Sequence, residues 1–205
     1  MKRLLYLIPV LAGLCLAPGA HAQSGNGTDS HTRDFELKLN TLSLPLLVSN
    51  IGIELQALDH FSVSVPVYYS ALNWFSENVK FRVLATQPEL RFWLRKDLTG
   101  LFVNAHATVG WYNVAVGGDY RYQSYARKSP ACGGGLGVGY KVRLGASRWG
   151  LEFGLGAGVL PLHYDFYYNI HNGRRVGDNE YTYWGPDQAF LSLTYRIGQV
   201  THSRK

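Results

Sequence analysis

Apolar and polar residues alternate with a period of two through most of this chain, and this pattern limits the possible folds more than any other feature. A period of two places successive side chains on opposite faces of a β-strand. In the segment 35–41, for example, Phe and Leu occupy the odd positions, whereas Glu, Lys and Asn occupy the even ones. Because no segment has a convincing helical period, the sequence predicts an all-β fold.

Eight segments carry the alternation. They are 35–41, 51–56, 61–67, a stretch that ends with 89–94, 103–110, 133–140, 151–159 and 188–196. Short connections at 58–60, 95–100 and 143–149 alternate with longer ones at 70–80, 113–130 and 168–184, although the connection 42–50 is short and apolar and fits less well. Membrane barrels alternate short turns with long loops in this way. We therefore expect an eight-stranded antiparallel up-and-down transmembrane β-barrel over residues 34–198.

A soluble lipocalin-like barrel would show the same alternation, so other residues must decide which face meets lipid. The five tryptophans fall at predicted strand ends or in connections, as expected for aromatic belts at the membrane interfaces. They are Trp74, Trp93, Trp111, Trp149 and Trp184. Repeated glycines at 133–139 and 154–158 occupy the polar face of two adjacent strands. Glycine there would leave room in a narrow lumen for side chains from the opposite wall, which favours the membrane barrel.

The N-terminus has the composition of a cleaved export signal. Lys2 and Arg3 precede an apolar run to Leu16, and Ala20-His21-Ala22 fits a signal peptidase site, so we expect residues 1–22 to be removed. Residues 23–33 form a polar periplasmic leader and 199–205 a periplasmic tail in this interpretation. The expected location is the outer membrane of a Gram-negative bacterium.

Charged residues on the polar face of the predicted strands are candidates for a structural network that fills the lumen. The proposed members are Glu36, Lys38, Glu54, Glu89, Arg91, His106, Glu152 and Arg196. An eight-stranded barrel is about filled by its own side chains, so we expect a closed interior with negligible conduction. A narrow pore remains an alternative.

Motifs that suggest chemistry are few. His106 and Thr108 share a face, and some small outer-membrane barrels are lipid A deacylases, so a lipid-modifying enzyme is a second alternative. His163 and Asp165 are two residues apart but lack further donors for a metal. The glycines of 133–139 have no helix after them to make a phosphate loop. The sequence therefore predicts no catalytic, cofactor or metal site.

The longer connections are candidates for contacts with partners, although ordinary loops with interfacial aromatic residues would have the same composition. The segments 113–130 and 168–184 are rich in tyrosine and arginine, which are enriched in protein interfaces and also suit lipopolysaccharide phosphates. Removing Lys2 and Arg3 lowers the basic count from 20 to 18 against 14 acidic residues. This mild excess, without a basic run, gives no indication of nucleic-acid binding. The expected partners are outer-membrane lipid and lipopolysaccharide, with other surface proteins as candidates.

Two segments carry a family resemblance: Thr86-Gln87-Pro88-Glu89-Leu90-Arg91-Phe92-Trp93-Leu94 and Tyr183-Trp184-Gly185-Pro186. In these the chain resembles a Bacteroidota outer-membrane family known only as a domain of unknown function, DUF3575. The resemblance extends over nearly all of 35–198 and implies a small outer-membrane barrel without an assigned catalytic residue. The expected function is a structural or interaction role, for instance as a subunit of a larger outer-membrane assembly.

Overall fold

The computed structural model describes residues 32–45, 47–73 and 78–201, all within the unit formed by residues 31–205. These residues form an antiparallel all-β sheet of ten strands with two short 3-10 helices, η1 (Thr41–Ser43) and η2 (Tyr125–Arg127). The strands are β1 (Thr32–Asn40), β2 (Ser49–Leu58), β3 (Phe61–Asn73), β4 (Val79–Thr86), β5 (Glu89–Trp93), β6 (Gly100–Val116), β7 (Tyr120–Ser124), β8 (Ala131–Arg143), β9 (Trp149–Tyr168) and β10 (Arg175–Thr201). The predicted signal peptide lies outside the described residues. No helix among the described residues is long and apolar enough to cross a membrane.

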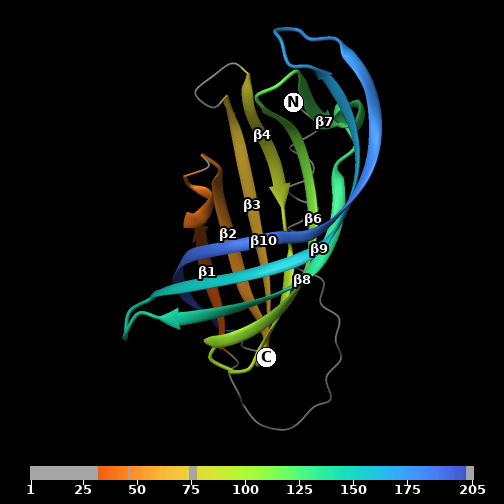
Figure 1. Ribbon diagram of the computed structural model, residues 1–205. Coiled ribbons are helices and arrows are strands. Elements are labelled where there is room, and N and C mark those ends of the chain that lie inside the picture. The colour runs from red at the N-terminus through yellow and green to blue at the C-terminus, as the bar shows by residue number, and fades with distance from the viewer. Residues whose placement is uncertain (1–31, 46, 74–77, 202–205) are drawn as a thin grey trace. The chain divides into compact units, whose positions relative to one another are not determined.

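The strands close into a ring of hydrogen bonds (Figure 1). Apart from β4 with β5 and β7 with β8, strands that are consecutive in the chain pair with each other, and β1 pairs with β10 from Thr32 opposite Thr201 to Asn40 opposite Ser192. Because the first strand therefore lies against the last, the sheet has no free edge along this seam.

Two positions in the ring are shared by two strands each. β4 and β5 both lie between β3 and β6, and β7 and β8 both lie between β6 and β9. The break between β4 and β5 falls at Gln87-Pro88, where proline has no N–H for the ladder. The ten strands of the structure thus replace the eight segments expected from the sequence.

Polar side chains face the inside of the ring and apolar side chains face outward. In β5, Glu89, Arg91 and Trp93 are buried, whereas Leu90 and Phe92 are exposed. β6 repeats the pattern, with Asn104 and His106 inside and Leu101 and Val103 outside. The interior is therefore built mainly from groups that an ordinary hydrophobic core excludes.

Several predicted connections are instead strand. The segment 113–130 contains the end of β6 and all of β7, most of 168–184 lies in β10, and β3 and β4 enter the predicted loop 70–80. These extensions carry polar or aromatic residues on both faces, so the alternation of hydrophobicity fades although the strand continues. Hydrophobic alternation detects only the part of a strand whose two faces differ in polarity.

The tryptophans are placed less uniformly than the sequence suggested. Trp93 is fully buried inside the ring because it shares the inward face of Glu89 and Arg91. Trp111 and Trp184 lie within β6 and β10 rather than at their ends, and Trp149 begins β9. Trp74 lies outside the described residues.

Candidate functional site

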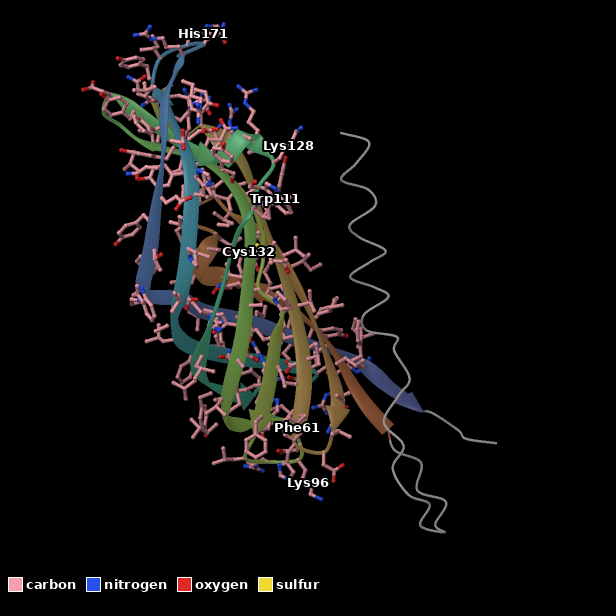
Figure 2. The ribbon with its side chains drawn as sticks, turned by 90° about the vertical axis from the view of Figure 1, so that its right-hand side faces the viewer. Phe61, Lys96, Trp111, Lys128, Cys132 and His171 are labelled. Atoms are coloured by element: carbon pink, nitrogen blue, oxygen red, sulfur yellow. The ribbon has the colours of Figure 1, made fainter. Side chains whose placement is uncertain are left out.

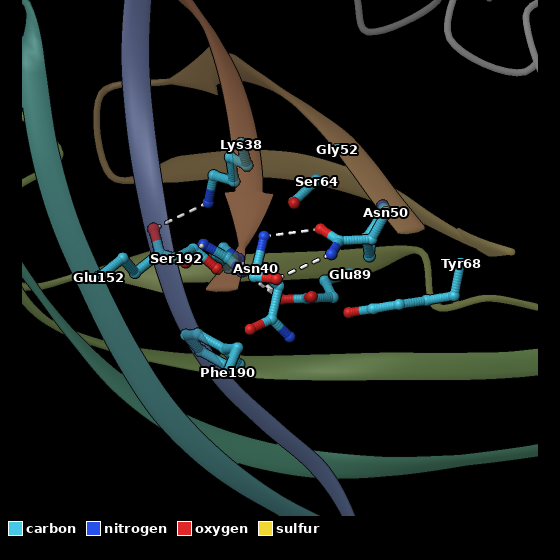
Figure 3. A pocket seen from close by; sticks show the side chains of 12 residues that line it. Lys38, Asn40, Asn50, Gly52, Ser64, Tyr68, Glu89, Glu152, Phe190 and Ser192 are labelled. Atoms are coloured by element: carbon cyan, nitrogen blue, oxygen red, sulfur yellow. Dashed lines mark hydrogen bonds and ion pairs between the residues drawn. The ribbon is translucent and has the colours of Figure 1, made fainter. Parts of the chain in front are cut away.

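The centre of the ring holds an ion-pair cluster formed by four strands. The ammonium nitrogen of Lys38, in β1, lies 2.8 Å from a carboxylate oxygen of Glu152 in β9 (Figure 3). It also lies 2.5 Å from a carboxylate oxygen of Glu54 in β2. The guanidinium nitrogens of Arg91, in β5, lie 2.7 Å from a carboxylate oxygen of Glu152 and 2.7 Å from one of Glu89. Because Arg91, Glu54 and Glu152 are at most 2% exposed, each charge depends on its partners rather than on water.

A second ion-pair group joins the first on the side of β1, β8 and β10. Lys141 of β8 contacts Glu36, and Arg196 of β10 lies 3.0 Å from Asp34 and 3.7 Å from Glu36. Lys141 is also 4.0 Å from Glu54, which connects the two groups. Arg196 is more accessible than the others, with 23% of its side chain exposed, so this group extends to the end of the ring.

An apolar cluster closes the interior beside the charges. It comprises Trp93, Leu98, Phe102 and Phe190. The Arg91 guanidinium lies 4.6 Å from the centre of the Phe102 ring and 5.5 Å from that of Phe190, within cation–π range. Trp93 Nε1 donates a 2.8 Å hydrogen bond to Ser62, whose hydroxyl in turn donates to Glu54. Aromatic and charged residues therefore form one continuous filling.

The glycines of β8 and β9 make room for this filling. The strand register places Trp93, Phe102, Gly139, Gly154 and Phe190 in one row around the ring. A Cβ added to Gly139 would lie 2.4 Å from Phe102 Cζ, and one added to Gly154 would lie 2.4 Å from Phe190 Cζ. The phenyl rings come from the flanking strands β6 and β10, whereas the sequence led us to expect side chains from the opposite wall. The reason is that each phenyl ring covers glycine positions of the strand next to its own, where no side chain is in the way.

A layer of amide, imidazole and carboxylate groups continues the interior beside Arg91. Asn104 Nδ2 donates 2.9 Å hydrogen bonds to Glu89 and to Gln188, and His106 Nε2 lies 2.9 Å from Asp187 Oδ2. His106 thus lies apart from the ion-pair cluster to which the sequence assigned it, and Asp187 is its acidic partner. Thr108, which the sequence placed on the same face as His106, accepts a hydrogen bond from Gln87.

Little free space remains inside. The cavity in Figure 3 is lined by Lys38, Asn50, Tyr68, Arg91 and Glu152 among others, and its free volume of about 20 Å³ suffices for one or two water molecules. A second cavity, beside Lys141 and Arg196, has about 10 Å³. The geometry suits a rigid filling rather than a binding pocket, since ligand sites in proteins measure hundreds of Å³.

The described residues include no group of three or more His, Cys, Asp or Glu side chains that could hold a metal ion. His163 Nε2 lies 3.4 Å from Asp178 Oδ2, and His163 Nδ1 lies 3.7 Å from Glu180 Oε1. The His163 ring stacks on the ring of Tyr125. Asp165, which the sequence paired with His163, accepts hydrogen bonds from the Arg175 guanidinium and from the backbone N–H of Ala126.

The interior also contains residues that the sequence reasoning did not select. Lys141 continues the inward row of Gly133 to Gly139, so extending the alternation by one step would have found it. Asp187 is next to Gln188 on the chain, yet both contact interior residues because the β9–β10 register shifts between Pro186 and Gln188. A register shift of this kind gives no signal in the hydrophobic pattern.

A comparison with protein families places the chain. The model described as Protein of unknown function (DUF3575) matches residues 14–197. The chain belongs to the DUF3575 family. Comparisons of this DUF3575 chain with curated proteins and with solved structures found no match. The resemblance to DUF3575 drawn from the sequence is confirmed, and the family description assigns no activity to the residues above.

Proposed function

We propose that this DUF3575 protein is an eight-stranded outer-membrane β-barrel with a filled interior and a structural or interaction role. Counting β4 with β5 and β7 with β8 gives eight positions around the ring. An even number brings both chain ends to the same side, as in bacterial outer-membrane barrels, and the short connections after β2, β5 and β8 lie on that side.

The inverted polarity of the ring carries the proposal. Eight acidic or basic strand residues are buried inside it: Asp34, Glu36, Lys38, Glu54, Glu89, Arg91, Lys141 and Glu152. Large apolar side chains are exposed outside, among them Leu136 at 70% and Leu155 at 66%. A soluble barrel would bury the apolar face, whereas lipid favours it on the outside.

Aromatic side chains that are exposed or half-buried lie at both ends of the apolar band. At the end near the short turns, the ring centres of Trp149 and Tyr195 are 4.7 Å apart, and those of Tyr140 and Phe153 are 5.9 Å apart. Toward the other end, Tyr69 of β3 is paired with Leu84 of β4, and Leu84 is paired with Trp111 of β6. The two aromatic residues therefore lie at the same level of the sheet. The nine residues 151–159 between these levels would span roughly 20–25 Å when tilted, which matches the apolar band of such barrels.

The filled interior argues for a role that does not involve passage through the barrel. The ion pairs, the aromatic cluster and the glycine rows leave cavities for only a few water molecules. Any activity should therefore depend on the outer wall or on the longer connections, where a lipid or another envelope protein could bind.

Membrane fractionation and electrophoresis test the barrel itself. We expect the protein in the outer-membrane fraction, migrating faster before boiling than after, because a folded barrel resists detergent. Recovery from the soluble periplasm with identical migration would overturn the proposal. Planar-bilayer recordings should show no stepwise conductance, and lipid A from cells with and without the protein should be identical. Conductance or altered lipid A would instead support a pore or a lipid-modifying enzyme.

Crosslinking in intact outer membranes tests the interaction role. A stoichiometric partner that remains attached to the folded protein is expected. Finding the protein always alone, at native abundance, would overturn the proposal that it is a subunit of an assembly.

A further inference from the structure

A polar row lies directly beyond Tyr69 and Trp111, on the strand face that carries these two aromatic residues. The ladder pairs Arg82 of β4 with Asn113 of β6, and Asn113 with Gln123 of β7. Residues directly opposite one another on neighbouring strands share a face. Arg82 and Asn113 are each two residues beyond the row of Leu84 and Trp111, which is roughly 7 Å along the strand. The row therefore begins where the apolar wall ends.

Arginines gather on this row without acidic partners. Arg121, two residues from Gln123 on the same face of β7, lies 4.7 Å from the centre of the Tyr167 ring. The Arg82 guanidinium donates to Asn73, a neutral group. Neither arginine, nor the exposed Arg127 of η2, forms an ion pair with a residue that the structure describes. The nearest acid in the row, Asp165 opposite Gln123, is paired with Arg175 at 2.8 Å.

Three polar atoms of the row are buried without a hydrogen-bond partner among the described residues. They are Arg121 Nε, Asn113 Oδ1 and Gln123 Oε1. Buried polar groups are nearly always satisfied, so three unpaired atoms on neighbouring positions leave hydrogen-bonding capacity for a bound ligand or water. Each amide can also present two N–H donors after rotation of its last side-chain bond.

The arginines also influence one another. Burial lowers the pKa of Arg121 below its ordinary value, and the nearby charges of Arg127 and Arg82 lower it further despite Tyr167. Mutual repulsion of this kind is relieved by an anion bound between the guanidinium groups.

The segment that carries Arg127 is hydrogen-bonded to Trp111, one of the aromatic residues below the polar row. Trp111 Nε1 donates a 2.9 Å hydrogen bond to the carbonyl of Lys128. Figure 2 shows Trp111 and Lys128 close together toward the end marked by His171, whereas Phe61 and Lys96 mark the opposite end. This bond holds a basic segment against the boundary between the apolar wall and the longer connections.

We propose that Arg82, Arg121 and Arg127, with Asn113 and Gln123, bind a phosphate group of an outer-leaflet lipid. Arginine forms paired hydrogen bonds with phosphate oxygens, and the amides supply further donors. A lipid rather than free phosphate fits because Tyr69, Leu84 and Trp111 lie directly below, where the acyl chains of that lipid would pack. The site rests on the proposed membrane location and assigns it a ligand class.

Binding of diphosphorylated lipid A to the full-length protein in a zwitterionic detergent tests the site. The matched pair of double variants is R82Q/R121Q, in the row, and R95Q/R143Q, two exposed arginines near the turns at the opposite end. The row variant should lose at least roughly tenfold in affinity, since it removes two charge-assisted contacts. The control variant should bind as the wild type does, and inorganic phosphate should compete only weakly.

Each result bears on the site. Equal lipid A affinity of R82Q/R121Q and wild type, both shown folded by faster migration before boiling, overturns it. Competition by inorganic phosphate at concentrations similar to those of lipid A overturns the lipid assignment and leaves an anion site. If R82Q/R121Q does not fold, R127Q replaces it, because Arg127 is exposed and outside the sheet; unchanged affinity would again overturn the site. Failure to reach the outer membrane would contradict the proposed function, while binding in detergent would still test the phosphate site.

Discussion

At the residue scale, the interior charges are arranged so that each is shared. Glu152 accepts from both Lys38 and Arg91, and each of those cations has a second carboxylate in Glu54 or Glu89. Burying a lone charge costs several kcal/mol of desolvation free energy, and the attraction of two opposite charges to the same group offsets this cost. The arrangement favours one packing of the interior, because no member can move without unpairing another.

Replacing Glu152 with alanine should destabilise the protein by about 3 kcal/mol, because two buried cations lose a shared partner. Urea unfolding in lipid vesicles, followed by tryptophan fluorescence, measures the change. Lys96→Ala is the matched control: Lys96 pairs with Asp59 at 2.9 Å on the exposed turn side, and its loss should leave the midpoint unchanged. Equal midpoints for both variants would show that the interior cluster adds no stability.

Gly139→Ala should destabilise the protein by roughly 1–3 kcal/mol, because its Cβ would overlap the Phe102 ring. Adding Phe102→Leu should recover part of that loss, since the shorter side chain vacates the site. A double-mutant cycle on unfolding free energies measures the coupling. Gly198→Ala, where nothing lies within 4 Å, serves as the control. Additive effects of Gly139→Ala and Phe102→Leu would contradict direct contact.

At the element scale, each strand has one face for the interior and one for the surroundings. In β9, Leu151, Phe153 and Leu155 point outward while Glu152 and the alternate glycines point inward. Contact of this outer face with an apolar medium would stabilise such a strand, because it removes the exposed Leu and Phe side chains from water. The outer face is therefore where the membrane proposal is tested most directly.

Leu155→Arg, in the middle of the outward face of β9, should cost about 2–4 kcal/mol in vesicles, the expected range for arginine near the bilayer midplane. Val116→Arg is the control, because Val116 is 85% exposed at the end of β6, beyond the aromatic level. Its change should stay within about 0.5 kcal/mol. Unfolding free energies in vesicles give both values. Similar small changes at the two sites would indicate that residue 155 faces water.

The inward faces could be predicted from alternation, because a polar residue at every second position is visible in the sequence. This reasoning selected Glu54, Arg91 and Glu152, which the structure brings into contact. It did not find Asp187, which follows a register shift, or β7, whose tyrosines lie on a strand polar on both faces. Which charges pair also could not be predicted, because pairing across the interior depends on the stagger of the strands.

At the scale of the whole molecule, closure of the ring is the property that no single strand supplies. β1 and β10 are the ends of the described sheet in sequence, yet each has hydrogen-bonded neighbours on both sides. The network crosses this seam as well, since Lys38 of β1 contacts Glu152 of β9 and Arg196 of β10 contacts Asp34. Closure and filling therefore depend on the same strands.

Amide hydrogen exchange tests this closure. In an open sheet the edge strands exchange first, because half of their backbone groups face solvent and they detach by local opening. In a closed ring, opening β1 would break ladders on two sides and unpair the buried Lys38 and Glu36. We therefore expect the amides of 36–39 and 189–194 to be protected as strongly as those of 102–106 in β6, measured in vesicles by mass spectrometry. Faster exchange confined to β1 and β10, by a factor of about 100 or more, would correspond to local opening some 3 kcal/mol easier than elsewhere. It would mean that the seam between β1 and β10 opens in the vesicle-bound protein.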